Sequence, residues 1–395
     1  MIEEAFRDEW SRVVASLARR FGDLDIAEEA AGDAFLAAAE RWPIDGQPAN
    51  PGGWLMTTAT RRAIDRLRRE NVRDQRHRAA AMITHQPDPV GIVEDDQLRL
   101  IFTCCHPALA PEARTALTLR LVAGLTVPEI ARAFLIPETT LAQRITRAKS
   151  KIRAAAIPLR VPEREDLANR LADVLAVIYL IFNEGYLPGE PGHADLAAEG
   201  VRLARLMRGL MPTDGEVAGL LALMLLTESR RGSRYGTSGE LVTLADQGRG
   251  GWDHALIAEG HALVRERLAS GLSPGVYQLQ AAINAVHTDA GDARDTDWSQ
   301  VVALYDQLYA LQPTPVVALN RAVAIAEMDG PEVALAIVEP LDLVGYHSWH
   351  VTRADLLRRL GRSREARAAY ARAIELAVNP GEIAYLTRRL GELVG

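Results

Sequence analysis

The chain has 395 residues, which exceeds one ordinary domain and leads us to expect two or three. Hydrophobic residues make up 48% of it and aromatic residues only 5%, and no segment shows sustained β-branched alternation, so the composition predicts an all-α protein. The net charge of −7 disfavours indiscriminate binding to nucleic acid. Because no signal peptide opens the sequence and no apolar run is long enough for a bilayer, we expect a cytoplasmic protein without membrane contact.

Residues 2–41 show two amphipathic helical patterns separated by Gly22-Asp23, with Asp25 predicted to cap the second. The second pattern carries a cluster of acidic residues, and two interpretations of that cluster remain open. It is either a solvated helix face or a docking patch for a basic partner. The cluster consists of Asp25, Glu28, Glu29 and Asp33.

Residues 43–53 are rich in Pro, Gly and Asn, which predicts a loop able to present Asn50 outward. A helix follows, with Trp54 at its start and a row of arginines on its outer face. An aromatic side chain beside such a loop can stack on unpaired bases, while arginines follow the backbone; the alternative is that Trp54 belongs to the core. The arginines are Arg61, Arg62, Arg66, Arg68, Arg69 and Arg73.

Residues 74–95 have no strong periodicity and are predicted to form a flexible linker.

Beyond them, Cys104, Cys105 and His106 invite a metal-site interpretation. Adjacent ligands strain a single tetrahedral site, however, and the sequence has no CxxC partner, so we expect small buried cysteines and neither metal nor cofactor. Two adjacent cysteines are also a poor structural disulfide, which indicates a reducing compartment.

Residues 126–153 predict a helix-turn-helix. Thr126 is placed to cap the first helix and the second opens at Pro137-Glu138, after which Leu141, Ile145, Ala148 and Ile152 recur at helical spacing. The opposite face carries side chains suited to base edges and phosphates in a major groove. These are Thr139, Thr140, Gln143, Arg144, Arg147, Lys149 and Lys151. The alternative is an amphipathic helix pair with a solvated basic face.

Taken together, three segments over residues 2–155 resemble regions 2 and 4 of a sigma-70-type factor of the extracytoplasmic-function (ECF) group. They are DLDIAEEAAGDAFLAAAERW, PGGWLMTTATRRAIDRLRRENVR and LTVPEIARAFLIPETTLAQRITRAKSKIR. The resemblance implies core RNA polymerase, through its β′ clamp helices and β flap, and promoter DNA as partners. Asp33 and Phe35 match the polymerase-docking helix. The loop with Asn50, and Trp54, Arg61, Arg62, Asp65 and Arg66 after it, match the part that captures the −10 element. Thr139, Thr140, Gln143, Arg144 and Arg147 match the helix facing the −35 element, and Lys149 on the same face is also expected to bind DNA.

Residues 156–395 predict further helices, with a buried central helix at 171–182. The segments 301–313 and 364–380 share a layout that resembles tetratricopeptide (TPR) helix pairs. The whole chain is thus similar to ECF factors with a C-terminal TPR-like extension, which implies a regulatory role for that extension. No polar residues in it show catalytic spacing, so we expect no enzyme.

The expected organisation is sigma region 2 at residues 1–73, a linker at 74–95, sigma region 4 at 96–155, a helical extension at 156–290 and TPR-like repeats at 291–395. The expected function is that of a sigma factor regulated by its C-terminal domain, and contact between that domain and the sigma domains stays open. The alternative is a stand-alone helix-turn-helix regulator with a C-terminal ligand-sensing domain.

Overall fold

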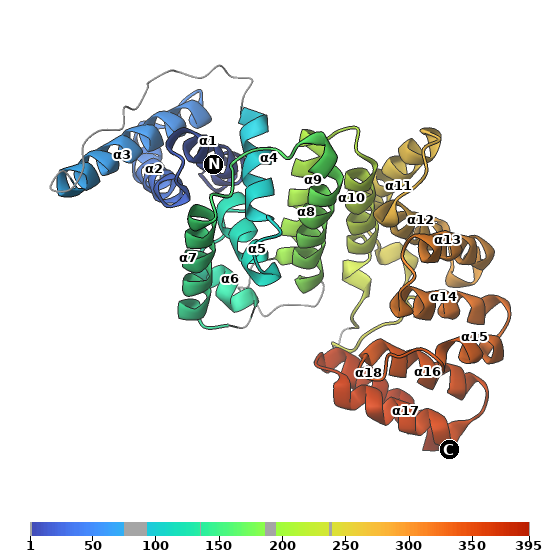
Figure 1. Ribbon diagram of the computed structural model, residues 1–395. Coiled ribbons are helices and arrows are strands. Elements are labelled where there is room, and N and C mark those ends of the chain that lie inside the picture. The colour runs from blue at the N-terminus through green and yellow to red at the C-terminus, as the bar shows by residue number, and fades with distance from the viewer. Residues whose placement is uncertain (1, 75–92, 135, 186–194, 237–238, 395) are drawn as a thin grey trace. The chain divides into compact units, whose positions relative to one another are not determined.

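The computed structural model describes residues 2–74, 93–134, 136–185, 195–236 and 239–394, and these contain eighteen α-helices and no extended strand (Figure 1). The prediction of an all-α protein is confirmed. The chain forms two compact units, Met1–Leu210 and Met211–Gly395. None of the helices in the described ranges combines the length and the apolar character of a bilayer span.

Unit 1 begins with α1 (Ile2–Phe21), α2 (Leu24–Asp45) and α3 (Pro51–Asp74). Asp23, rather than the expected Asp25, caps α2, because its carboxylate accepts hydrogen bonds from the first backbone N–H groups of the helix. The helix also continues through Pro43 and stops only before Gly46, whose φ of 84° suits glycine. The expected loop at 43–53 is therefore shorter than predicted.

The rest of unit 1 consists of α4 (Val93–Cys104), α5 (Pro111–Leu117), a π-helical turn (Thr118–Val122), α6 (Val127–Ala133), α7 (Glu138–Ala154), α8 (Arg164–Glu184) and α9 (Leu196–Leu210). The predicted buried helix at 171–182 is confirmed within α8, which packs on α9. Most of the predicted linker, residues 75–92, lies outside the described residues.

Cys104 ends α4 and Cys105 follows it; both cysteines are free and buried, as predicted. Burial raises the pKa of both thiols, that of Cys105 to about 11, so neither forms a thiolate at neutral pH. No cluster of three or more His, Cys, Asp or Glu side chains with metal-binding geometry occurs in the described part of the chain.

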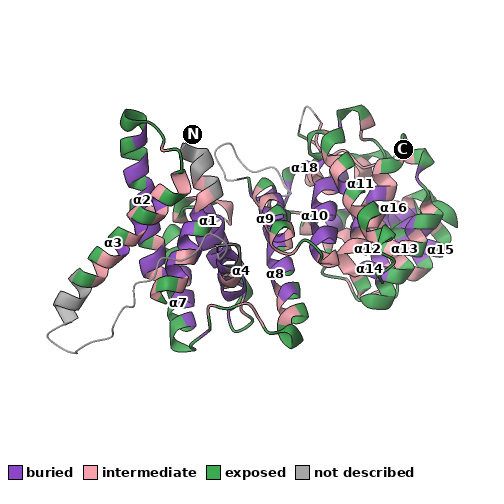
Figure 2. Ribbon diagram, turned by 90° about the horizontal axis from the view of Figure 1, so that it is seen from above, coloured by how far each residue is buried: buried purple, intermediate pink, exposed green. Residues whose placement is uncertain are grey.

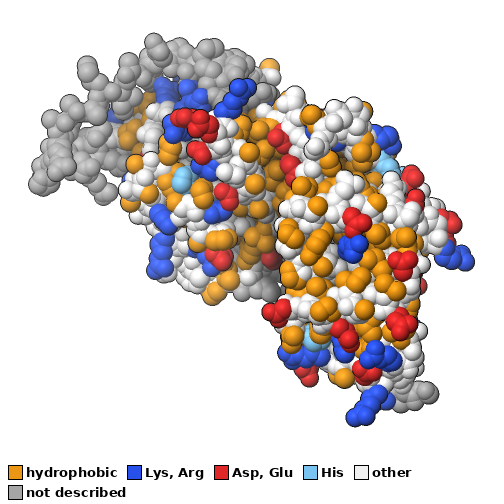
Figure 3. All heavy atoms as spheres, turned by 45° about the vertical axis from the view of Figure 1, so that its right-hand side comes forward, with side chains coloured by type: hydrophobic (Ala, Val, Ile, Leu, Met, Phe, Trp, Pro, Cys, Tyr) orange, Lys and Arg blue, Asp and Glu red, His pale blue; other side chains and the backbone are white. Residues whose placement is uncertain are grey.

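Unit 2 is a succession of helices in which each packs against its neighbours in sequence. They are α10 (Gly215–Glu228), α11 (His254–Ala269), α12 (Val276–Asp289), α13 (Trp298–Leu311), α14 (Pro315–Met328), α15 (Pro331–Val338), α16 (His347–Arg359), α17 (Ser363–Leu376) and α18 (Pro380–Gly391). Figure 2 shows α10 largely buried, in agreement with its unbroken run of buried residues from Val217 to Leu226. On the face drawn in Figure 3, acidic and basic side chains lie in small groups between apolar patches.

Gly219 permits the close approach of α10 to α12, because a Cβ at this position would lie 2.6 Å from the backbone nitrogen of Gln278. We predict that Gly219→Ala lowers the free energy of unfolding by about 1–3 kcal/mol, since α12 must shift. Gly32→Ala is the control: this residue lies inside α2 with no heavy atom near its would-be Cβ, so the change should stabilise by up to about 1 kcal/mol. Urea unfolding followed by helical circular dichroism measures both, and equal midpoints would contradict the prediction.

Candidate nucleic-acid interface

The helix-turn-helix consists of α6 and α7. Thr126 and Glu129 form a capping box at the start of α6: the Thr126 hydroxyl accepts from the Glu129 N–H, and the Glu129 carboxylate accepts from the Thr126 N–H at 2.7 Å. The predicted cap and the predicted start of the second helix after Pro137 are both confirmed. The apolar stripe of α7 is buried as expected, and consists of Leu141, Ile145, Ala148 and Ile152. Burial of this stripe fixes which face of α7 points outward.

The outward face of α7 brings together most of the side chains predicted to read DNA. Thr139, Thr140, Gln143 and Arg147 are exposed, and Arg144 is half-buried. A hollow of about 330 Å³ beside the helix is lined in part by Thr140, Gln143, Arg144, Arg147 and Lys151. Hydroxyl, amide and guanidinium groups on one helical face are the groups that contact base edges and phosphates.

The face of α3 presents a second set of predicted residues. Arg61 and Arg62 are exposed, whereas Arg66 forms an ion pair with Glu29 of α2. Trp54 is half-buried, with its ring packed edge-on against Trp42 at a centroid distance of 5.6 Å. Both interpretations of Trp54 are therefore partly met, because one side of the ring packs inward and part of it stays accessible.

Asn50 is exposed, and its side chain closes the first turn of α3. The Asn50 carboxamide oxygen accepts a hydrogen bond from the Gly53 N–H at 2.9 Å. A structural role for Asn50 is thus visible in addition to the predicted one.

The two residues predicted to contact polymerase differ in exposure. Asp33 is exposed, but Phe35 is only 6% exposed and packs against Phe6 and Trp10 at centroid distances of 4.9 and 5.7 Å. A direct contact by Phe35 does not fit this burial, because two aromatic rings, those of Phe6 and Trp10, fix it in the core. The exposed apolar neighbour of Asp33 is Leu36, which is 61% exposed.

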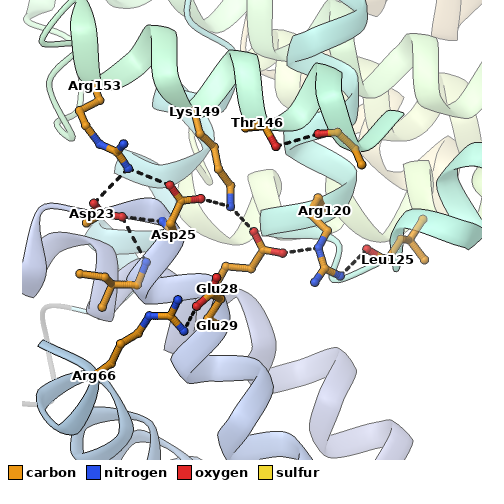
Figure 4. A network of polar contacts seen from close by, with 12 residues as sticks. Asp23, Asp25, Glu28, Glu29, Arg66, Arg120, Leu125, Thr146, Lys149 and Arg153 are labelled. Atoms are coloured by element: carbon orange, nitrogen blue, oxygen red, sulfur yellow. Dashed lines mark hydrogen bonds and ion pairs between the residues drawn. The ribbon is translucent and has the colours of Figure 1, made fainter. Parts of the chain in front are cut away.

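Lys149 also departs from its predicted position. It is only 8% exposed, and its ammonium group donates to Asp25 at 2.8 Å and to Glu28, both on α2 (Figure 4). Arg153 extends the contact by binding Asp23 at 3.1 Å and Asp25 at 2.7 Å. In this arrangement the Lys149 side chain is not available to a DNA phosphate.

Arg120, in the π-helical turn, completes the contact by an ion pair between its Nε and Glu28. We call these six residues the α2–α7 network; they are Asp23, Asp25, Glu28, Arg120, Lys149 and Arg153 (Figure 4). The acidic cluster of α2 therefore meets a basic partner, and that partner is the same chain. The sequence contains a signal for this pairing, because the helix at residues 24–45 is acidic and the helix at residues 138–154 is basic.

The charge state of the network follows from the pKa of Asp25. Burial raises the pKa of Asp25, but the hydrogen bonds and charges of Lys149 and Arg153 together lower it by more. The net pKa therefore lies below the ordinary 3.8. The contact thus contributes stability above pH 3.8 and loses it only as pH falls through the lowered value. At neutral pH the Asp25 carboxylate is therefore charged.

A second polar contact joins the same two parts of unit 1. The Arg19 guanidinium on α1 binds Asp96 of α4 at 2.9 Å, and Asp96 is only 1% exposed. Next to it, the Gln97 amide donates to the Ser11 hydroxyl at 2.6 Å. Because these groups are buried and paired, α1–α3 and α4–α7 form one packed body here.

Comparisons with known proteins give three family matches. Residues 6–73 match the family described as Sigma-70 region 2, residues 99–152 match Sigma-70, region 4, and residues 170–268 match a family of unknown function, DUF6596. The first two cover nearly all of α3 and of α7 respectively.

Relatives fall into two groups. An uncharacterized protein of Rhizobium meliloti (strain 1021) is 43% identical over 396 residues, covering 97% of this chain and 93% of the relative. The ECF RNA polymerase sigma factor SigK of Mycobacterium ulcerans (strain Agy99) is 30% identical over 159 residues, covering 38% of this chain and 79% of the relative. SigK of Mycobacterium tuberculosis (strain ATCC 25618 / H37Rv) is 31% identical over 159 residues, which again cover 38% of this chain and 79% of the relative. No solved structure matches the chain.

Lys149 and Lys151 are the only lysines in the sequence, so amine labelling reports on the α2–α7 network directly. We predict that Glu28→Gln raises the rate of Lys149 acetylation, measured by mass spectrometry against the exposed Lys151, because the buried ammonium loses one of two carboxylates. A loss of about 2 kcal/mol corresponds to a roughly thirtyfold increase. Glu40→Gln, at an exposed acid on the same helix, should leave the ratio unchanged. Equal Lys149 rates in both variants would show that the network does not hold Lys149.

Proposed function

The chain belongs to the family of ECF RNA polymerase sigma factors, and we propose that it directs core polymerase to promoters through α1–α3 and α4–α7. Sigma factors are not enzymes; their regions 2 and 4 bind core polymerase and promoter DNA. The observation that carries the proposal is the presence, in this order, of both sigma regions with an exposed polar face on α3 and on α7. Because core RNA polymerase acts in the cytoplasm, we expect this protein to be located there as well.

For the −10 element, the proposal assigns the exposed end of α3. Arg61 and Arg62 would follow the phosphates of a separated strand, and the accessible side of Trp54 would stack on a base, with Asn50 and Arg66 beside them. Arg66 must first leave Glu29, an exchange that costs little because both side chains are more than 40% exposed.

For the −35 element, the proposal assigns the outward face of α7. Thr139, Thr140 and Gln143 would meet base edges or phosphates, and Arg144 and Arg147 would supply charge-assisted contacts. Lys149 would join them only after release from Asp25 and Glu28.

For core polymerase, the proposal assigns the exposed part of α2 to the β′ clamp helices and the α4–α7 module to the β flap. Asp33 offers a charge and Leu36 an apolar side chain one turn away on the same helix. Phe35 would act indirectly, by fixing α2 on Phe6 and Trp10.

The α2–α7 network makes the free protein a closed form in this proposal. The −10 and −35 elements lie apart on a promoter, whereas α1–α3 and α4–α7 here share a buried polar contact. Binding to polymerase would have to replace these ion pairs before both helices could reach DNA. Phosphates would then compete with Asp25 and Glu28 for the same basic groups.

For the C-terminal part, we propose a regulatory role carried by a TPR-like helix stack. Support comes from the neighbour-to-neighbour packing of α13 on α14 and of α16 on α17, which is the packing of repeat proteins. Stacks of this kind leave a concave face for a ligand or a partner.

Polymerase docking can be separated from stability at neighbouring residues of α2. We predict that Leu36→Ala weakens binding to core polymerase while leaving the melting temperature nearly unchanged, because the side chain is exposed. Phe35→Ala should instead destabilise unit 1 by about 3–5 kcal/mol through loss of buried aromatic packing. Fluorescence anisotropy with core enzyme and thermal unfolding measure the two effects. Unchanged affinity in the Leu36 variant would remove Leu36 from the docking surface.

Run-off transcription with core polymerase tests the function itself, on promoters selected from a random library by the reconstituted holoenzyme. We predict initiation by the wild type, and a larger loss in open-complex formation than in closed-complex binding when Arg61 and Arg62 are both replaced by Ala. Arg372→Ala, at an exposed arginine of α17, is the control. A chain ending at Leu210, which keeps unit 1, should initiate at a changed level.

Two results would contradict these assignments. Tight binding of the free protein to a duplex site without any initiation by core enzyme would favour the stand-alone regulator. Wild-type output from the chain ending at Leu210 would remove the regulatory role of unit 2.

A further inference from the structure

Unit 2 contains a groove of about 1010 Å³ between its helices. It is lined by α12, α13, α14, α16, α18 and the segment 243–249, and its volume lies at the upper end of the range for small-molecule sites. Six arginines and three carboxylates line it, which makes it positive in a chain of net charge −7. The arginines are Arg249, Arg294, Arg358, Arg359, Arg388 and Arg389, and the carboxylates are Asp246, Glu327 and Asp355.

Most of these arginines already have an acidic partner. Arg358 binds Asp355 at 2.6 Å and Arg359 binds Glu327 at 2.6 Å. Arg389 and Arg294 are paired in the same way, with Glu392 at 2.7 Å and with Asp292 at 3.0 Å. An extended acidic chain laid along the groove would therefore meet largely neutralised cations.

Arg249 differs from the others. Both of its terminal nitrogens are buried and have no hydrogen-bond acceptor among the described residues. The guanidinium lies over the ring of Trp252 at 4.1 Å from the centroid. The indole nitrogen of Trp252 is likewise buried and has no hydrogen-bond acceptor among the described residues. Donors without acceptors are therefore concentrated around one indole.

Buried donors without acceptors lower the stability of a folded protein unless a bound group supplies the acceptors. A buried donor without an acceptor costs about 1–3 kcal/mol, and an unpaired buried cation costs more. Burial and the charges of Arg230 and Arg249 also lower the pKa of the nearby His287 to about 4, so its imidazole is neutral at physiological pH and does not add to the charge. The missing group is thus an acceptor with negative charge.

We propose that the groove binds a small organic anion whose carboxylate or phosphate accepts hydrogen bonds from Arg249. A guanidinium suits an oxyanion because it can donate two parallel hydrogen bonds. The body of the ligand would lie against Trp298 and Tyr305, which line the same groove. The single anionic anchor distinguishes this ligand from an acidic peptide. The site goes beyond the sigma function, because it requires neither polymerase nor promoter.

Calorimetric titration of the full chain in low-chloride buffer tests the site, with inorganic phosphate, citrate and a hexaglutamate peptide as separate probes. We expect one saturable site for phosphate or citrate, with a dissociation constant of about 1 mM or tighter. Arg249→Met should weaken binding at least tenfold, whereas Arg372→Met, the same change at an exposed arginine outside the groove, should alter it less than twofold.

Thermal unfolding without anions separates a binding role of Arg249 from a structural one. Removal of an unpaired buried charge should leave the melting temperature of Arg249→Met equal to or above that of the wild type. A lower melting temperature would indicate that Arg249 serves the fold and would overturn the proposal. Absence of saturable binding of phosphate and citrate, or equal binding by both variants, would overturn it as well. Binding of hexaglutamate alone would replace the small anion by an acidic protein segment.

Discussion

One basic side chain, Lys149, ties the two N-terminal helical modules together. It lies on α7, which we propose contacts the −35 element, yet its ammonium group is buried between Asp25 and Glu28 of α2, within sigma region 2. A lysine at this depth has to keep its carboxylates or exchange them for other anions, because an unpaired buried charge is costly. Phosphate groups on DNA are such anions. In the proposed function, the closed arrangement and DNA binding thus compete for the charge of Lys149.

The geometry of the rest of unit 1 supports this exchange. Arg144, Arg147 and the hydroxyl residues of α7 remain on the outward face, so the proposed reading surface is already formed while Lys149 is buried against α2. The capping box of Thr126 and Glu129 fixes α6 regardless of the state of the network. Opening therefore requires separation of packed modules and not refolding of the helix-turn-helix.

Sequence periodicity predicted the helices and the inward face of α7 well, because buried stripes at helical spacing determine both. It misplaced the cap of α2 by two residues, since Asp23 and Asp25 are equally good capping residues and only the backbone decides between them. Phe35 and Leu36 show a second limit. Both are large and apolar, and only the positions of Phe6 and Trp10, on a different helix, decide which one is buried. Lys149 shows a third, because its partners are more than 120 residues away in the chain.

The proposed function requires the two modules, α1–α3 and α4–α7, to be closed in the free protein and open on polymerase. Dyes attached to Glu40→Cys on α2 and Ser150→Cys on α7, both exposed positions, measure this separation by energy transfer. The native cysteines are buried with raised pKa values and should not compete for the dyes. We predict high transfer in the free protein and a large fall when core polymerase is added without DNA. Equal transfer in both states would contradict the account.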